Sequence, residues 1–339
     1  MNKKGVLLIN LGTPDSPSAA DVSKYLREFL MDPRVIDINA FSRTLLVKGI
    51  IAPTRGPKSA RLYKEIWDEK TGSPLLHYSL LQQQLLQEKL GGEYVVELAM
   101  RYQSPSMASA LQRLKDALIY DIVVIPLFPQ YASASTGSVY DKLMELLIDW
   151  PTKPTIRFIN SFHDDELMIE TFADNARKHK PETFDQILFS FHGLPQRQLI
   201  KSDHTHKTCL QSSDCCQTLT DANRYCYSAQ SHHTARLIAE KLNIPKEKYI
   251  VCFQSRLGSD PWVQPYTIDI IHQMAKEGKK RLLVFCPAFV ADCLETLYEV
   301  PVEYGTEFKK LGGEEVQLVE SLNDSPKFIE ALAKMSTSK

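Results

Sequence analysis

A single histidine stands where an apolar segment ends. His192 follows residues 186–191 (QILFSF) and precedes Gly193. In α/β proteins, the residue that follows a parallel strand lies at the edge of the sheet where ligands bind. A neutral imidazole in that place can accept a proton near pH 7 or bind a metal ion. A lone histidine could equally be a core or helix-capping residue, so the neighbouring chemistry decides between these readings.

Three carboxylates follow another apolar segment, residues 282–285. Asp292, Glu295 and Glu299 are spaced i, i+3 and i+7, which places them on one face of an α-helix. Like charges at this spacing repel by about 0.2–0.5 kcal/mol. A solvated acidic face is the common explanation, but the surrounding residues are largely apolar. We therefore predict that these carboxylates and His192 bind a divalent cation.

Four of the seven cysteines lie in one polar segment, residues 201–227. The segment contains few aliphatic residues and could hardly be ordered by a core. Disulfides are disfavoured in a reducing compartment, so the group indicates either a tetrahedral zinc site or an iron–sulfur cluster. Reduced thiols or disulfides remain the other alternative. The four residues are Cys209, Cys215, Cys216 and Cys226.

Short apolar segments alternate with helical periodicity along most of the chain, which predicts an α/β fold with doubly wound parallel sheets. The expected strands are residues 6–10, 94–100, 122–128, 155–159, 186–191, 249–253, 282–285 and 315–319. The expected helices are residues 19–30, 75–90, 107–117, 138–148, 230–242 and 266–276, with a final helix at 326–335.

The two halves of the chain resemble one another. Residues 6–14 (VLLINLGTP) align with 187–195 (ILFSFHGLP), and 124–131 (VIPLFPQY) align with 282–289 (LLVFCPAF), in the same order. This repetition predicts two Rossmann-like domains with a ligand-binding cleft between them. The expected domains are residues 1–160 and residues 161–339. The second would carry the cysteine-rich insertion at 201–227 and a final helix that packs back on the first.

Composition excludes some classes of function. The chain has 339 residues and a formal net charge of −1, which gives no general attraction to nucleic acid. No apolar stretch approaches the roughly 18 residues of a membrane-spanning helix, and no signal peptide is recognisable. We therefore expect a cytoplasmic protein. Apolar residues at 41–51 could form a lip that contacts a membrane, although core positions are the preferred interpretation: Phe41, Leu45, Leu46, Val47, Ile50 and Ile51.

Further residues near the expected strand ends suit a large planar ligand that bears carboxylates. Aromatic rings offer stacking faces, and arginine pairs with carboxylates in two-point geometry. Some of these residues fall on the long connection after the first strand. Taken singly, each is more often a core or surface residue. The set is Arg55, Tyr63, Ser73, Arg101, Tyr102 and Trp262, together with residues 128–131 and 254–258.

Residues 190–195 (SFHGLP) and 292–299 (DCLETLYE) together resemble the ferrochelatases. The resemblance extends over nearly the whole chain and includes residues 10–15 (NLGTPD). It implies insertion of ferrous iron into protoporphyrin IX, with His192 and Glu295 as the catalytic and metal-binding pair. It also implies that Asp292 and Glu299 guide the metal or carry protons. The porphyrin-contacting positions that it implies are Arg55, Tyr63, Ser73, Arg101, Tyr102, Trp262 and Phe289.

The resemblance leaves alternatives and one cofactor to consider. The cysteine spacing is similar to that of a subset of bacterial ferrochelatases thought to hold a [2Fe–2S] cluster. Coproporphyrin is the alternative substrate, and a cobalt-inserting chelatase is the alternative enzyme of the same architecture. A two-domain protein that binds a metal or tetrapyrrole without turnover is a reading from another class. A nucleotide-binding enzyme is disfavoured, because the turn after the first strand holds one glycine and no G-x-G-x-x-G.

Overall fold

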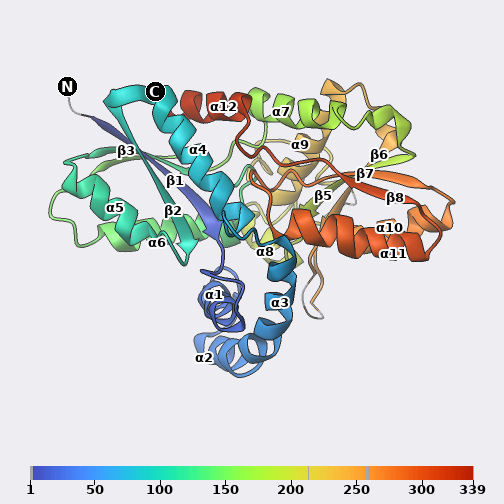
Figure 1. The fold of residues 1–339 in the computed structure, drawn as a ribbon, viewed down its shortest axis with the longest axis horizontal. Coiled ribbons are helices and arrows are strands. Elements are labelled where there is room, and N and C mark those ends of the chain that lie inside the picture. Colours follow the sequence, from blue (N-terminus) through green and yellow to red (C-terminus); the bar gives the residue numbers. More distant parts are fainter. Residues whose placement is uncertain (1–2, 213, 257, 259, 339) are drawn as a thin grey trace. The chain divides into compact units, whose positions relative to one another are not determined.

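The computed structural model describes residues 3–212, 214–256, 258 and 260–338, which form two four-stranded parallel sheets (Figure 1). The first sheet has the order β2-β1-β3-β4, and the second has the order β6-β5-β7-β8. In each sheet, the strand that comes first in the chain lies between the second and the third, and the fourth is at the edge beside the third. The two sheets therefore share one topology. The predicted α/β fold with doubly wound parallel sheets is confirmed.

The strands lie where the apolar segments predict them. In the first sheet, Val6 pairs with Val96 on one side and Val123 on the other. In the second, Phe189 pairs with Val251 and Phe285. The strands are β1 (Lys4–Gly12), β2 (Tyr94–Tyr102), β3 (Asp121–Pro126), β4 (Thr155–Phe158), β5 (Gln186–His192), β6 (Tyr249–Gln254), β7 (Arg281–Phe285) and β8 (Glu315–Leu318).

Helices connect successive strands, and several begin at a side-chain cap. Ser18, Ser106 and Asp165 each accept a hydrogen bond from a backbone N–H of the first turn. The α-helices are α1 (Ala19–Met31), α2 (Ala40–Thr44), α3 (Ala52–Ile66), α4 (Pro74–Leu90), α5 (Met107–Asp116), α6 (Ser138–Leu147), α7 (Glu166–Arg177), α8 (Gln196–Ser202), α9 (Tyr227–Lys241), α10 (Thr267–Lys276), α11 (Gly305–Lys310) and α12 (Pro326–Thr337). The π-helices are η1 (Leu45–Ile51), η3 (Ser133–Gly137) and η6 (Glu295–Tyr304), and the 3₁₀ turns are η2 (Gly91–Glu93), η4 (Pro181–Thr183) and η5 (Lys246–Lys248).

The crossovers cover both faces of each sheet. In the second sheet, α9 lies on one face, and α10 and α11 lie on the other (Figure 1). Right-handed crossovers require this arrangement, because the chain reverses its direction across the sheet after β6. Strand β5 is therefore buried on both sides, which explains why its sequence is apolar without alternation.

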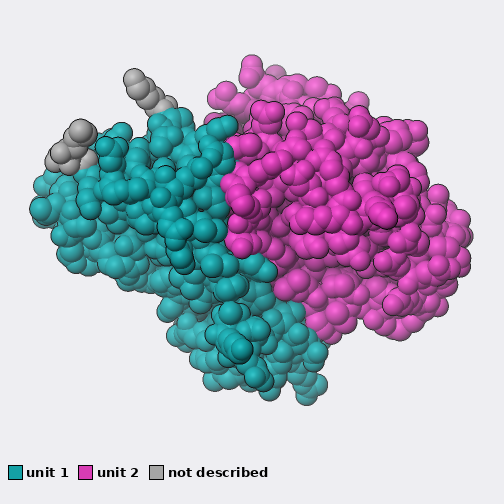
Figure 2. All heavy atoms as spheres, turned by 45° about the horizontal axis from the view of Figure 1, so that its top comes forward, with its two compact units in different colours: residues 1–128, 133–160, 329–339 teal, residues 129–132, 161–328 magenta. Residues whose placement is uncertain are grey.

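The described chain divides into two compact units, coloured separately in Figure 2. Unit 1 comprises residues 1–128, 133–160 and 329–339, and unit 2 comprises residues 129–132 and 161–328. The first sheet and the C-terminal part of α12 therefore belong to unit 1. The described residues contain no helix that is both long and apolar enough to cross a membrane.

The connection after β1 is more helical than the sequence suggests. Helices α2, η1 and α3 occupy residues 40–66, although Pro57 lies inside α3. A Cβ atom at Gly56 would lie 1.9 Å from Ser23 Oγ of α1, so the glycine allows these helices to pack closely. Packing against α1 outweighs the low helix propensity of proline and glycine.

The apolar residues of this connection divide between core and surface. Val47 and Ile51 are buried, and Leu46 packs against the same cluster. Phe41, Leu45 and Ile50 are 80%, 63% and 56% exposed. The preferred core interpretation is therefore confirmed for the first group and wrong for the second.

Candidate active site

The topology of unit 2 brings two predicted segments together. β5 is flanked by β6 and β7, and the crossovers that leave β5 and β6 run in opposite directions across the sheet. Ligands of doubly wound sheets bind at such a reversal, beyond the carboxyl ends of the strands. His192 is the last residue of β5, and the segment with the three carboxylates follows β7.

His192 is held in one tautomer. Its Nδ1 lies 2.7 Å from the carbonyl oxygen of Gly193, which can only accept, so Nδ1 carries the hydrogen of the neutral ring. Nε2 then carries a lone pair, and no described residue makes a hydrogen bond to it. This atom is available to take a proton or bind a metal ion.

Gly193 and Trp262 shape the surroundings of this imidazole. The Gly193 N–H donates to the carbonyl oxygen of Gln254 at 2.8 Å, and a Cβ at Gly193 would lie 2.8 Å from the same oxygen. The Trp262 ring centre lies 6.4 Å from that of His192, with an angle of 50° between the planes. The predicted histidine and tryptophan are thus neighbours, brought together where β5 and β6 end.

The acidic segment is a π-helix rather than the expected α-helix. η6 begins at Glu295, while Asp292 precedes it in irregular backbone, so the three carboxylates do not share one regular helix. A π-helix has i→i+5 hydrogen bonds, and such turns occur frequently at functional sites. Glu295 and Glu299 remain electrostatic neighbours within η6.

Glu299 is enclosed by polar donors. Its Oε1 accepts from the Tyr304 hydroxyl at 2.5 Å, and its Oε2 accepts from Ser255 Oγ at 2.8 Å and Gln254 Nε2 at 3.1 Å. Burial raises the pKa of Glu299 above its usual value, against the lowering effect of these donors and of His192. A carboxylate in this state accepts a proton more readily than one in water.

Asp292 joins two segments instead of facing solvent. The side chain is buried, and it accepts from Thr296 Oγ1 at 2.9 Å and from Asn323 Nδ2 at 2.7 Å. Its backbone N–H donates to Asn323 Oδ1 at 2.9 Å. Both carboxylate oxygens therefore hold η6 to the segment after β8, and metal binding by Asp292 stays a prediction.

We expect Asp292→Ala to destabilise the protein by about 2–4 kcal/mol, because it removes a buried carboxylate that accepts hydrogen bonds from Thr296 Oγ1 and Asn323 Nδ2. Glu295→Gln, at a half-buried position, should change the free energy of unfolding by less than about 1 kcal/mol. Urea unfolding of both variants measures the difference. Equal losses would show that Asp292 has no special structural role.

Two predicted porphyrin-contacting residues in unit 1 surround a buried carboxylate. Arg101 Nη2 lies 2.6 Å from Asp32 Oδ2, and the Tyr102 hydroxyl donates to the same oxygen at 2.9 Å. Ser138 Oγ donates to it at 2.5 Å. Burial and the charge of Asp32 raise the pKa of Tyr102. Arg101 and Tyr102 are therefore brought together, with their polar groups already engaged.

The remaining predicted contacts fall into buried and exposed positions. Ser73 is buried, and its Oγ accepts from Thr13 Oγ1 at 2.8 Å, where Thr13 directly follows β1. Tyr63 is buried beside Trp67, with ring centres 6.5 Å apart. Arg55 is exposed on α3. Phe289 is partly buried against the core of unit 2.

The four predicted cysteines lie around one cavity of about 280 Å³ in unit 2. All four are free thiols of intermediate exposure, and the Cys215 and Cys216 sulfur atoms are 3.5 Å apart. Burial and the neighbouring Cys226 and Cys215 raise the pKa of Cys209 to about 12. The hydrogen bond from Cys216 lowers the pKa of Cys226 to about 7.

Polar side chains order the segment that carries these cysteines. Asp203 accepts from the backbone N–H groups of Thr208 and Cys209, each at 2.8 Å. Asn223 donates to the carbonyl oxygens of Cys215 and Thr218 at 3.0 and 2.9 Å. Residue Ser213 of the predicted insertion lies outside the described residues.

Sequence reasoning missed several partners of the predicted residues. Asp32 and Ser138 support Arg101, while Tyr304 supports Glu299. Asp32, Ser138 and Tyr304 follow no strand, so their positions along the chain offered no signal. Ser255, which also supports Glu299, is among the residues expected near a strand end.

Known proteins match nearly the whole chain. The family model described as Ferrochelatase matches residues 3–339. A curated ferrochelatase of Coxiella burnetii (strain Dugway 5J108-111) is 42% identical over 335 residues, 99% of this chain and 93% of that protein. A ferrochelatase of Legionella pneumophila (strain Paris) is 42% identical over 330 residues, 97% of each chain.

Among solved structures, SirB from Bacillus subtilis with Fe³⁺ is similar with a TM-score of 0.52 and 11% identity, covering 99% of this chain and 96% of that chain. At this identity the likeness concerns the fold alone. The family match and the relatives extend over nearly the entire sequence. This chain belongs to the ferrochelatase family.

Proposed function

We propose that the chain inserts ferrous iron into protoporphyrin IX to give protohaem, with release of two protons. The observation that carries the proposal is the His192 imidazole, whose tautomer leaves Nε2 unprotonated beside an electrostatic partner, Glu299. Insertion requires bases for two pyrrole N–H protons and ligands that replace the water of the incoming ion. The family membership supports this reaction class.

We assign the proton and metal steps to four residues. His192 Nε2 accepts one pyrrole proton, and Glu295 helps to deliver iron or accepts the other proton. Glu299, whose pKa is raised by burial, can receive a proton and pass it toward Tyr304 and Ser255, its hydrogen-bond partners. Asp292 and Glu299 complete the proposed metal-guiding set.

For the porphyrin, we propose two kinds of contact. Exposed Arg55 and partly exposed Arg101 supply cationic groups for propionates, and aromatic rings supply stacking faces. The buried members of the set would position the residues that contact the porphyrin. The proposed set is Arg55, Tyr63, Ser73, Arg101, Tyr102, Trp262 and Phe289.

The experiment mixes anaerobic protein with ferrous iron and, separately, protoporphyrin and coproporphyrin, and follows the loss of porphyrin fluorescence. We expect many turnovers with protoporphyrin and faster turnover than with coproporphyrin. The reverse order would favour the coproporphyrin alternative. A signal that stops at one equivalent per chain would favour a binding protein. Competition between ferrous iron and Co²⁺ tests the cobalt-chelatase alternative.

We also propose that the cysteine segment holds a [2Fe–2S] cluster. The residues fit such a group, because four free thiols line one cavity and the segment has few apolar residues of its own. Cys209, Cys215, Cys216 and Cys226 would be the ligands. Four thiolates would also fit tetrahedral zinc. A bound cluster would supply a redox-active centre, and the iron-insertion steps assigned above do not use it.

We expect anaerobically purified protein to show visible absorption bands that disappear on reduction, together with acid-labile sulfide. Cys226→Ala should remove both signals, because Cys226, which caps the start of α9 and is hydrogen-bonded to Cys216, is one of the four proposed ligands. Cys252→Ala, at a buried cysteine outside the segment, is the control that should keep them. A colourless protein with one zinc ion per chain would show that the cysteine segment binds zinc and not a cluster.

Peripheral membrane contact and a cytoplasmic location are part of the same proposal. Support for contact comes from Phe41, Leu45 and Ile50, which expose apolar side chains along α2 and η1. Exposed apolar groups on neighbouring helical turns are typical of surfaces that enter the interfacial region of a bilayer. Protoporphyrin is poorly soluble in water, so such a surface would let it pass from the bilayer to the protein without entering the solvent.

A further inference from the structure

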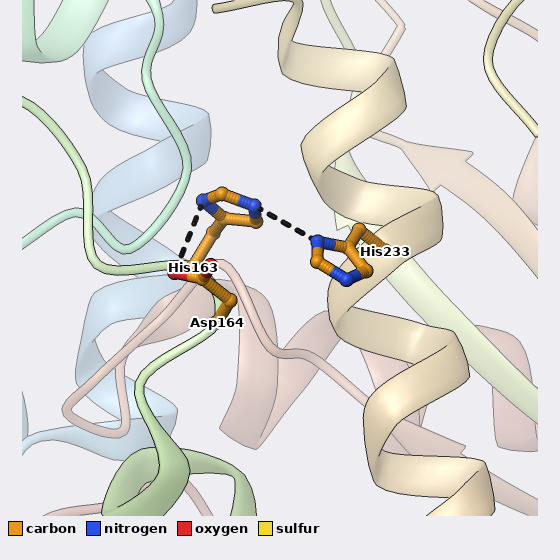
Figure 3. A group of neighbouring side chains, drawn as sticks. All are labelled: His163, Asp164 and His233. Carbon is orange, nitrogen blue, oxygen red and sulfur yellow. Dashed lines mark hydrogen bonds and ion pairs between the residues drawn. The ribbon is translucent and has the colours of Figure 1, made fainter. Parts of the chain in front are cut away.

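A second group of metal-ligand side chains lies in unit 2, formed by none of the residues above. His163 precedes α7 and His233 lies on α9, and Figure 3 shows a nitrogen of each ring pointing toward the other ring, with Asp164 beside His163. His163 Nε2 is 3.2 Å from His233 Nδ1, and His163 Nδ1 is 3.8 Å from Asp164 Oδ1. One ligand atom from each residue lies within 4.8 Å of the others.

The hydrogen bonds around His163 determine which nitrogen carries a lone pair. Ser161 Oγ lies 2.9 Å from the Pro129 carbonyl oxygen, 3.1 Å from Gln230 Oε1 and 2.9 Å from His163 Nδ1. The Gln230 amide is oriented with its oxygen here, because that oxygen also accepts from the Tyr131 N–H at 2.6 Å. The single hydroxyl hydrogen therefore goes to one of two carbonyl oxygens. In this arrangement Ser161 Oγ accepts from His163 Nδ1–H, which leaves a lone pair on Nε2, the nitrogen close to His233.

This arrangement is typical of a metal-binding histidine. Such residues usually donate their other ring N–H to an oxygen, which fixes the ring orientation and the tautomer. Burial lowers the pKa of His163 to about 4, and burial together with Arg236 lowers the pKa of His233. Burial thus favours the neutral form of both rings.

The distance between the rings fits one bound ion. Two imidazole nitrogens at about 2.0–2.1 Å from a tetrahedral Zn²⁺ lie roughly 3.3 Å apart. The observed separation of 3.2 Å, which is that of a hydrogen bond between the rings, is close to this value, so both nitrogens would bind one ion after a rotation of the rings that turns their lone pairs toward it. The Asp164 side chain is 54% exposed, so its carboxylate can rotate toward the ion.

We propose that His163 Nε2, His233 Nδ1 and the Asp164 carboxylate bind one first-row divalent transition-metal ion, for which Zn²⁺ is the probe. Two imidazoles and one carboxylate suit zinc, cobalt and ferrous iron, with water in the remaining positions. The ion would attach the segment that begins at Ser161, where the chain passes from unit 1 into unit 2, to helix α9. Its function is to stabilise this entry into unit 2.

The test uses the full chain with His192→Ala and Glu295→Gln as the parent, so that metal at the proposed insertion site does not obscure the count. The cysteines stay in every variant, and only differences from the parent are scored. Zn²⁺ per chain is measured after gel filtration, and Co²⁺ is followed through its visible ligand-field bands. The added changes are His163→Gln, His233→Gln, Asp164→Asn and Ser161→Ala, with exposed His272→Gln as the matched control.

We expect His163→Gln and His233→Gln each to bind one Zn²⁺ fewer than the parent and to lose one component of the Co²⁺ spectrum. Asp164→Asn should weaken Zn²⁺ binding and change the Co²⁺ bands, and Ser161→Ala should weaken binding by roughly 10–100-fold. Zn²⁺ should raise the melting temperature of the parent and of His272→Gln, but less that of the histidine variants.

Equal zinc counts and equal Co²⁺ spectra in the parent, His163→Gln and His233→Gln would overturn the proposal, and the rings would be a hydrogen-bonded pair only. An unchanged Asp164→Asn would remove the carboxylate from the ligand set and overturn the three-ligand site. If buried His163→Gln fails to fold, half-buried His233→Gln and exposed Asp164→Asn still decide the outcome.

Discussion

Replacing His192 with alanine should reduce the rate of ferrous iron insertion by roughly 100- to 10,000-fold, the range typical for loss of a general base. The expected cause is loss of Nε2, the lone-pair nitrogen that the hydrogen bond to Gly193 leaves unprotonated. The rate is measured anaerobically from protoporphyrin fluorescence at saturating iron. The folded state should change little, because the imidazole makes one short local hydrogen bond.

His272→Ala is the control for this experiment, since His272 is an exposed histidine of unit 2 on α10. It should keep the rate of the unaltered protein. Near-normal turnover in both His192→Ala and Glu295→Gln would show that the proposed catalytic pair is wrong, even if the protein inserts iron.

The second large effect concerns stability and the end of β1. Gly12 has φ +117°, and a Cβ atom there would lie 2.0 Å from the Tyr102 carbonyl oxygen in the neighbouring strand. We expect Gly12→Ala to lower the free energy of unfolding by about 3 kcal/mol or more. The alanine would have a disfavoured backbone conformation, and its Cβ would also clash with the neighbouring strand. Urea unfolding followed by circular dichroism gives the change.

Gly278→Ala separates the two contributions. Gly278 also has a positive φ, +77°, but among the described residues no atom beyond its chain neighbours lies within 4 Å of the Cβ position. Its replacement should cost only about 1–2 kcal/mol. Equal losses in the two variants would mean that the end of β1 shifts easily and that the approach to Tyr102 is not a tight constraint.

The strands were predictable because their environment is uniform. β1 and β5 lie between helices on both faces, so nearly every position is apolar and the signal does not depend on register. The internal repeat likewise predicted a shared arrangement, which the matching strand orders confirm. The helices at residues 40–66 were not predicted, because Gly56 and Pro57 have low helix propensity and locally indicate a loop. Packing against α1 stabilises the helical structure despite them.

The candidate site was only partly predictable for a similar reason. His192 and Glu295 were identified by their positions after strands, and family resemblance assigned their roles. The π-helical form of η6 was not predictable, because an i, i+3, i+7 spacing fits an α-helix equally well. Asp32, in turn, comes from the end of α1 and reaches Arg101 only through the tertiary fold.

The ion pair of buried Asp32 and partly exposed Arg101 has an electrostatic consequence for anionic ligands. The carboxylate lies 2.6 Å from the guanidinium, so the pair has no net charge and its field falls off steeply with distance. An approaching anion is therefore hardly attracted by Arg101 until it is close enough for hydrogen bonding. Exposed Arg55 keeps its full long-range attraction. Arg55 would thus influence how fast a carboxylate-bearing ligand arrives, while Arg101 would influence only the orientation it adopts after arrival.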